Sequence, residues 1–579
     1  MTRFLFGPLG PAPLLAWLSI LLGLAVICVP GISIALLSSI LTRSRFNPCQ
    51  IPILGLAGAV WYAEVWSLFR KVDAQCLFSL IVISTFLSLW LIRYGRADLQ
   101  GVTRPKTRYL FLLVFFSFLV ALNAASRMNN GDSGIYHLNA IRWIQESGCP
   151  PGIANVHTRL GFNCSLFVAV ALLNRVLHAA QVSNGIVIMA CTIYLYGFLC
   201  EINFNFRHRA FLFLAAAFGG LVLPALSVFA SSPSPDVSQS ALAICTLVAG
   251  SQYFLLEKGE AELSNSILVL ILVASLHVKF KASGIVLAVG MAVCVGLTLA
   301  YQFKKRYARF KALACGAALF PLLVIPWVIR GYVTSGYPLF PSLLLGAPVD
   351  WRVPEILANN EAAWVYSWAR NPGFDWRIVL ADTHWLGPWW KRNAADPKNQ
   401  NIFVFWLISL GILASEMRAI LASGSAGKYP SAWKLACFIP SLTAVLFWFR
   451  TAPEPRFASG LLWSFGLALL LLATPSGTLS KKRSITYLIL IAVPVVSLSL
   501  VELNRMAHEK YLFPSRYRRI PLKELTSNYG VRVLVPAMGD QVGDSPVPAA
   551  PENRFQPNLQ YRGRTPKDGF RINGEAIIR

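Results

Sequence analysis

A polar segment around residue 132 carries the side chains best suited to acid–base chemistry. Asp132 is followed by Tyr136 and His137, and the same stretch continues to His157 and Arg159. One interpretation of Asp132 is a helix N-cap, because a carboxylate is stabilised at the start of a helix. The other is a general base, with the histidines and Arg159 converging around it. The residues alone leave both interpretations open.

The same segment offers side chains of the types that bind metals. Asp132, His137 and His157 could all act as ligands, but their spacing matches no specific metal motif. The chain also contains no Walker A loop, no GxGxxG after a strand, no HExxH and no CxxC pair. We therefore expect neither a cofactor nor a metal, and keep a divalent metal at this segment as the alternative.

The segment 331–401 is rich in aromatic side chains. Seven of the 17 Trp lie in it, spread along its length, and Arg330 directly precedes it. Aromatic faces beside charged groups suit the binding of a sugar ring and a phosphate. An interfacial aromatic belt is the alternative, but a belt places Trp near helix ends. We therefore favour substrate recognition for the group, with these candidate contacts: Arg330, Tyr337, Trp351 and His384.

Further charged residues lie where apolar stretches end. Asp236 stands at the start of one such stretch, and Lys279 and Lys281 interrupt another. A lysine at a helix end commonly extends to the interface without a function; the other interpretation is a cation that holds an anionic phosphate. Arg456 lies in a proline-rich turn, where it either binds a phosphate or pairs with Glu454.

The composition indicates an integral membrane protein. The chain has 579 residues, of which 55% are hydrophobic and only 13% charged, whereas soluble domains carry roughly 25% charged residues. Crossing a hydrocarbon core of about 30 Å takes about 20 apolar residues in a helix. The sequence predicts an all-α polytopic protein with about 14 transmembrane helices, near 11–41, 51–69, 76–93, 109–125, 185–202, 210–230, 237–256, 265–278, 282–302, 312–330, 402–420, 433–450, 458–474 and 484–503.

Two stretches depart from this simple pattern. The first run is interrupted by Pro30 and Gly31 and is either one kinked helix or a hairpin. The run 165–180 is broken by Asn174 and Arg175, and we expect it to be interfacial or re-entrant.

The basic residues predict the orientation of the chain. The formal net charge is +26, which in a soluble protein would suggest a nucleic-acid partner. Basic clusters fill short loops near 93–108, 207–209, 304–311 and 481–483, and such loops face the cytoplasm. The excess charge therefore indicates orientation and does not predict nucleic-acid binding. The other side then receives 126–164, 231–236, 279–281, 331–401, 451–457 and the tail after 504.

Two smaller features of the outward-facing segments are also informative. Cys149 and Cys164 share the first of these loops, so a disulfide between them is one option and two free thiols the other. In the tail, the residues 531–536 alternate in a manner typical of a short strand.

Four strings in the sequence resemble a known family. They are 132–137, 155–163, 335–341 and 452–457, and they look like a family of large bacterial multi-pass membrane proteins that is itself similar to the GT-C superfamily. GT-C enzymes are glycosyltransferases that use polyprenyl-phosphate sugars, among them the protein O-mannosyltransferases and the aminoarabinose transferase of lipid A. The resemblance extends from about residue 100 to the C-terminus.

The resemblance implies an enzyme and assigns roles to three residues. Asp132 matches the catalytic acidic position of the first outer loop, and Lys279, or with less support Lys281, matches a basic position for the lipid-linked phosphate, as does Arg456. One departure is that many GT-C enzymes carry a pair of acids where this chain has Asp132 followed by Ser133. The remaining candidate substrate contacts are Tyr136, His137, His157, Arg159, Asp236, Arg330, Tyr337, Trp351 and His384.

The implied reaction is an inverting sugar transfer on the outer face of a bacterial cytoplasmic membrane. The donor would be a polyprenyl-phosphate-linked sugar, and the acceptor a glycan, lipid or protein. The alternatives are a polymerase or ligase of lipid-linked glycans, and a transporter or flippase for them. A transporter is expected to carry buried charges along its path, yet only Glu64 lies clearly inside a predicted span, which disfavours this alternative.

The predicted organisation has five parts. They are N-terminal transmembrane helices (1–108), a GT-C-like transmembrane core (109–330) that contains the catalytic outer loop 126–164, a Trp-rich outer loop (331–401), C-terminal transmembrane helices (402–503) and a small mixed extracytoplasmic tail (504–579).

Overall fold

The fold was analysed in a computed structural model. It describes residues 11–42, 47–94, 110–174, 177–202, 205, 209–255, 262–302, 307–422, 432–473, 479–514 and 520–577. Most residues of the predicted basic loops, including 95–109, 206–208 and 303–306, lie outside these ranges, and so does Arg175.

Long apolar helices form most of the described chain. Ten of them are long and apolar enough to cross a membrane: α2 (Pro11–Thr42), α3 (Ile51–Phe69), α4 (Ala74–Tyr94), α8 (Ala179–Glu201), α11 (Leu263–Phe280), α12 (Ile285–Gln302), α13 (Tyr307–Ser335), α17 (Pro397–Ala422), α18 (Ala432–Thr451) and α20 (Lys481–His508). The prediction of a helical, multi-span membrane protein is thereby confirmed at this level, and the figure of about 14 spans stays a prediction.

Four more helices coincide with predicted apolar runs. Three are shorter and apolar: α5 (Leu110–Ala124), α9 (Arg209–Leu226) and α19 (Ser459–Ala473). The fourth, α10 (Pro235–Leu255), is more polar and almost entirely buried among other helices. The run at 165 forms α7 (Ser165–Leu173), whose 9 residues rise only about 13 Å. α7 is therefore too short to cross a membrane, as expected of an interfacial or re-entrant segment.

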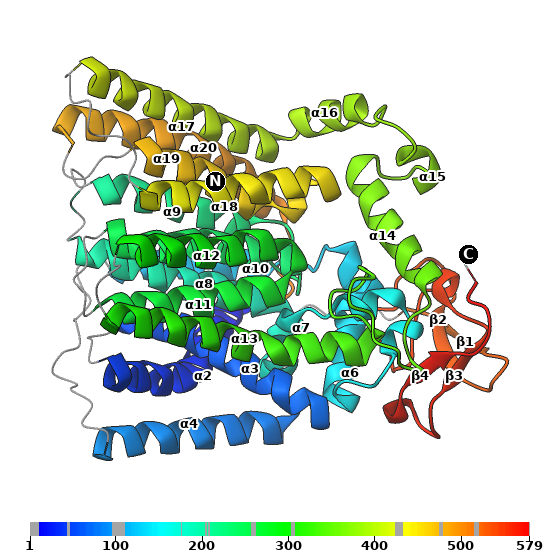
Figure 1. Cartoon of the computed structure of the whole chain (residues 1–579). Coiled ribbons are helices and arrows are strands. Elements are labelled where there is room, and N and C mark those ends of the chain that lie inside the picture. The colour runs from blue at the N-terminus through cyan, green and yellow to red at the C-terminus, as the bar shows by residue number, and fades with distance from the viewer. Residues whose placement is uncertain are drawn as a thin grey trace.

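The helices run roughly parallel, and the large loops gather at one end of the bundle (Figure 1). This loop-rich end holds the remaining helices and all the strands of the described chain. They are α6 (Leu138–Ser147), α14 (Glu355–Arg370), α15 (Trp376–Val379), α16 (Leu386–Ala395), β1 (Leu522–Thr526), β2 (Arg532–Pro536), β3 (Leu559–Tyr561) and β4 (Phe570–Ile572).

The C-terminal tail packs on the first large loop. β1 pairs antiparallel with β2, and β3 with β4, so the strand predicted at 531–536 is confirmed. Trp143 and Ile153 of the loop share one hydrophobic core with Val533 and Phe570 of the tail. Because burying apolar surface stabilises the contact by about 25 cal/mol per Å², this shared core fixes the tail against the loop.

Cys149 and Cys164 are separate free thiols in the structure, and both are buried. The disulfide that the sequence allowed between them is not formed.

α2 is a single helix with Pro30 inside it, which resolves the choice between a kinked helix and a hairpin. It packs closely on α3, and two glycines make the approach feasible. A Cβ atom on Gly55 would lie 1.7 Å from the carbonyl oxygen of Ile27, and one on Gly31 would lie 2.2 Å from that of Ile51. The backbones of the two helices are therefore in direct contact.

We expect Gly55→Ala to force α2 and α3 apart and to lower the unfolding midpoint in detergent, at a cost of roughly 1–3 kcal/mol or more. Gly411→Ala in α17 is the matched control, because a Cβ there meets nothing within 4 Å, and alanine favours a helix over glycine by about 1 kcal/mol. Equal midpoints for the two variants would contradict the close contact.

Candidate functional site

Asp132 lies at the loop-rich end, at the start of a π-helical turn, Ser133–His137, that leads into α6. Its side chain makes no capping hydrogen bond, so the helix-cap interpretation is wrong for this residue. The carboxylate instead meets two guanidinium groups. Arg159 Nη1 lies 3.1 Å from Oδ1, and Arg456 Nη2 lies 3.2 Å from Oδ2. The side chain keeps 26% of its surface exposed, which leaves it open to a ligand.

A second carboxylate stands on the other side of Arg456. Asp236, in the first turn of α10, has Oδ2 3.4 Å from Arg456 Nε, and its Oδ1 accepts a hydrogen bond from Lys281. Lys281 Nζ also lies 4.1 Å from the centre of the Phe457 ring. Arg456 therefore joins two carboxylates that are 104 positions apart in sequence, and it does so from the turn that follows α18.

Arg159 connects Asp132 to a third carboxylate. Glu361 in α14 is fully buried, and its Oε1 lies 3.1 Å from Arg159 Nε. Its Oε2 accepts from Arg554 Nη1 of the tail at 2.7 Å and from Thr158 Oγ1 at 2.5 Å. These contacts form one alternating series, here called the ion-pair chain: Arg554, Glu361, Arg159, Asp132, Arg456, Asp236 and Lys281.

The ion-pair chain keeps Asp132 ionised. Burial raises the pKa of this carboxyl, but the charges of His137, Arg159, Arg456 and Lys281 together more than offset that effect and leave its pKa below the usual range. Burial lowers the pKa of His137 to about 4, so at neutral pH the imidazole is uncharged. The cations that act on Asp132 at neutral pH are therefore Arg159, Arg456 and Lys281.

Aromatic rings surround the centre of the chain. The Arg456 guanidinium lies 5.1 Å from the ring centres of Trp368 and Phe457, and 5.2 Å from that of Phe229. Tyr136, buried behind Asp132, has the Arg159 guanidinium 5.8 Å from its ring centre. Of the Trp-rich segment, Trp368 thus reaches the site, with a partly exposed side chain.

Lys279 is not part of this cluster, contrary to the placement we expected for a phosphate-binding residue. Its Nζ lies 3.0 Å from Glu64 Oε2, and both side chains are fully buried. Lys279 is in the last turn of α11 and points into the bundle, whereas Lys281 follows the end of that helix in extended conformation. Lys281 is therefore the lysine that faces Asp236.

Four other predicted residues lie apart from the ion-pair chain. Tyr337 is buried and donates to the carbonyl oxygen of Val353. Trp351 donates to the Tyr332 carbonyl oxygen and carries the Arg562 guanidinium on its ring. His384 is exposed and pairs with Asp382. The fourth, Arg330, is buried. These placements do not support direct substrate contact by Tyr337, Trp351 or His384.

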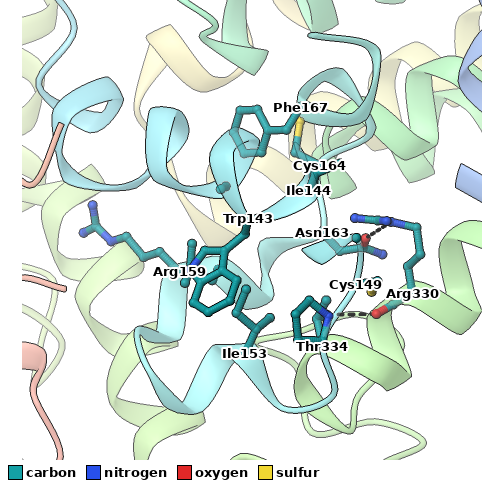
Figure 2. A pocket seen from close by; sticks show the side chains of 14 residues that line it. Trp143, Ile144, Cys149, Ile153, Arg159, Asn163, Cys164, Phe167, Arg330 and Thr334 are labelled. Carbon is teal, nitrogen blue, oxygen red and sulfur yellow. Dashed lines mark hydrogen bonds between the residues drawn. The ribbon is translucent and has the colours of Figure 1, made fainter. Parts of the chain in front are cut away.

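Arg330 is buried behind the site, where its guanidinium donates to Ser67 and to Asn163. It lines a small cavity together with Trp143 and Arg159, and Figure 2 shows the two arginines on opposite sides of that cavity. His157 is also buried, close to Tyr136, and burial lowers its pKa well below the usual range. Both side chains are buried and do not face solvent.

Sequence reasoning missed Glu361 and Arg554. Glu361 follows Asn359 and Asn360 in an ordinary polar helix, and Arg554 lies in an irregular tail. Neither residue stands in a sequence pattern that could have identified it. Lys281, by contrast, was among the candidates, but with less support than Lys279. Among the described residues, no group of three or more His, Cys, Asp or Glu side chains is placed to hold a metal ion.

Residues 14–463 match the model of a family described as a domain of unknown function, DUF8201, and the chain belongs to this family. No curated protein and no solved structure matches the chain. The matched region contains the ion-pair chain from Asp132 to Arg456 and ends before Arg554.

Breaking the Glu64–Lys279 pair should destabilise the fold. Glu64→Gln leaves a buried ammonium without its carboxylate, and we expect a loss of ~3–5 kcal/mol, whereas Glu64→Leu with Lys279→Met should recover most of it. Glu146→Gln, which removes an exposed partner of Arg142, is the control, with a change below about 1 kcal/mol. Thermal unfolding in detergent measures all three; a double variant as unstable as Glu64→Gln would contradict the pairing.

Proposed function

We propose that this chain is a GT-C-type membrane glycosyltransferase that moves a sugar from a polyprenyl-phosphate donor to a glycan, lipid or protein acceptor. The observation that supports it most is the position of Asp132, a partly exposed carboxylate held between Arg159 and Arg456 at the end of a helical bundle. In this proposal the loop-rich end faces the outside of a bacterial cytoplasmic membrane.

The proposed reaction is a single displacement at the anomeric carbon. The acceptor hydroxyl loses its proton to Asp132 as its oxygen bonds to the sugar, and the bond between the sugar and the phosphate oxygen breaks. The polyprenyl phosphate leaves with the electron pair, and the configuration inverts. General base catalysis contributes about 10²–10⁴-fold, and cations placed on the leaving phosphate stabilise the charge that develops there.

The cations available for the phosphate are Arg456 and Lys281. Both now pair with Asp236, so an incoming phosphate would compete with that carboxylate for them. Asp236 is a second acid beside Asp132 in space, although it is distant in sequence. Many GT-C enzymes have a second acid directly beside the catalytic one, where this chain has Ser133. In this proposal Asp236 takes the place of that second acid. Lys279 has no part in this proposal, because Glu64 neutralises it.

Donor binding would also activate the base. With its pKa below the usual range, Asp132 is ionised at rest but is a weak base, and general bases work best with a pKa near the working pH. A phosphate on Arg456 and Lys281 cancels part of the positive charge that lowers this pKa. The carboxylate of Asp132 therefore becomes a stronger base only when the donor is bound, so that it can take a proton from the acceptor hydroxyl at that point.

The aromatic surroundings agree with a sugar substrate. Trp368 lies against Arg456 with part of its side chain exposed, and the face of an aromatic ring packs well against the apolar face of a sugar. The transmembrane helices beside this site would place the polyprenyl chain in lipid, while the phosphate remains at the charged cluster.

Asp132→Asn should reduce transfer from a radiolabelled polyprenyl-phosphate sugar by at least ~100-fold, because the amide cannot accept the proton. Asp350→Asn is the matched control: Asp350 also pairs with an arginine, Arg562, but lies outside the ion-pair chain, and it should retain activity. Full activity in Asp132→Asn would overturn the assignment of the base. Movement of a lipid-linked glycan across vesicles without any transfer would favour a transporter, and a requirement for a long-glycan donor would favour a polymerase or ligase.

The pH dependence of kcat/KM should reflect the lowered pKa of Asp132. A carboxyl with a pKa below its ordinary value stays ionised as the pH falls, so we expect kcat/KM to hold from pH 7 down to about pH 5 and to decline only below that range. A decline centred near pH 6 would instead point to a carboxyl of raised pKa; burial raises the pKa of the neighbouring Glu454 in this way.

A further inference from the structure

We infer that Glu361 is a positioning residue for the site: together with Arg554 of the C-terminal tail, it sets the orientation of Arg159 and thereby the basicity of Asp132. The catalytic meaning of this inference rests on the proposed function, whereas the geometry and the electrostatic coupling do not.

Glu361 is a carboxylate with no access to solvent. Burying an unpaired carboxylate is costly, so such a group persists only where it is fully hydrogen-bonded and neutralised. Here Arg159 and Arg554 neutralise it from opposite sides, and Thr158 supplies a further hydrogen bond. Its pKa is accordingly held below the usual range, because the two arginines outweigh the effect of burial.

Arg159 transmits this constraint to Asp132. Its guanidinium binds Glu361 through Nε and Asp132 through Nη1, each at 3.1 Å. Because the guanidinium is a rigid plane, fixing Nε on the buried carboxylate also fixes the direction in which Nη1 points. Of the two carboxylates that Arg159 contacts, Asp132 is partly exposed and Glu361 is fully buried, so Glu361 determines the position of the arginine.

The tail is anchored to the same turn as Asp132. The carbonyl oxygen of Gly134 accepts hydrogen bonds from the backbone N–H groups of Val542, at 2.9 Å, and Gly543, at 2.7 Å. Arg142 in α6 also pairs with Asp544 at 3.6 Å. Arg554 therefore belongs to a segment that is attached both to the Asp132 turn and, through Glu361, to α14.

The two residues act on Asp132 in opposite electrostatic directions. Removing the negative charge of Glu361 leaves more positive charge around Asp132 and lowers its pKa, whereas removing the positive charge of Arg554 raises it. The charged and titratable groups that face Asp132 from the packed elements stay in place in both variants: Tyr136, His137, Arg159, Asp236, Lys281 and Arg456. Those that act on Glu361 are Arg159 and Arg554, and His157 lies near these two arginines.

The test is the protonation of Asp132 in the full chain, read as the carboxyl band in infrared spectra after subtraction of the spectrum of an Asp132→Asn sample. Glu361→Gln should move the titration midpoint to lower pH and Arg554→Gln to higher pH, each by roughly half to one unit, less than the 1–3 units of a directly contacting charge. Arg554→Lys should restore the midpoint, and Asp382→Asn, at an exposed carboxylate that pairs with His384 outside the ion-pair chain, should leave it unchanged.

Midpoints that do not move, or that move in the same direction in both variants, would overturn the inference. A merely structural role of Glu361 and Arg554 would change the yield of folded protein but would leave the titration midpoint of Asp132 unchanged. If Glu361→Gln does not fold, Arg554→Gln and Arg554→Lys decide the question alone. The infrared measurement needs no substrate. Absence of sugar transfer would therefore refute the proposed function and leave the inference about Glu361 and Arg554 unaffected. If transfer occurs, kcat should fall in Glu361→Gln with little change in the KM of the donor.

Discussion

The ion-pair chain from Arg554 to Lys281 is the constraint on which the loop-rich end depends. Its four cations and three carboxylates come from the first large loop, α10, the segment after α11, α14, the turn after α18 and the tail. Charged side chains that are removed from water must be paired. Each of these segments is therefore confined to the position in which its charged side chain contacts the oppositely charged neighbour in the ion-pair chain. A central carboxylate that stays partly exposed is the place where this series can open to a ligand.

The same rule explains which residues of the site were predictable. The apolar runs predicted the helices because each is long and uniformly apolar, and Asp132 and Arg456 were found because they stand in polar segments between such runs. Lys279 and Lys281 could not be separated in this way. They are two positions apart, so they leave the helix end on different sides, and only the packing decides which of them meets Glu64.

Glu361 and Arg554 were beyond prediction for a different reason. Their partners lie 202 and 193 residues away in sequence, and neither occurs in a motif with a recognisable spacing. Nor could the sequence show that Asp236 reaches Arg456, because this contact depends on how α10 packs against α19. His384 was predicted from its aromatic and polar neighbours in sequence, and the structure places it at an exposed position, paired with Asp382 and outside the ion-pair chain.

The tail acquires a role from this arrangement. It lies beyond the region matched by the family, yet it shares a hydrophobic core with the first loop and supplies Arg554 to Glu361. The helical bundle provides the positions of Asp236, Lys281 and Arg456, while the tail completes the series on the side of Arg159. The site is therefore assembled from both parts of the chain.

The most direct measurement is an electron cryo-microscopy structure of the full chain with a bound polyprenyl phosphate. We expect phosphate oxygens within hydrogen-bonding distance of Arg456 and Lys281, with Asp236 released from at least one of them and Asp132 facing the open side. A phosphate bound at another place, with the contacts of Arg456 to Asp132 and Asp236 unchanged, would contradict it.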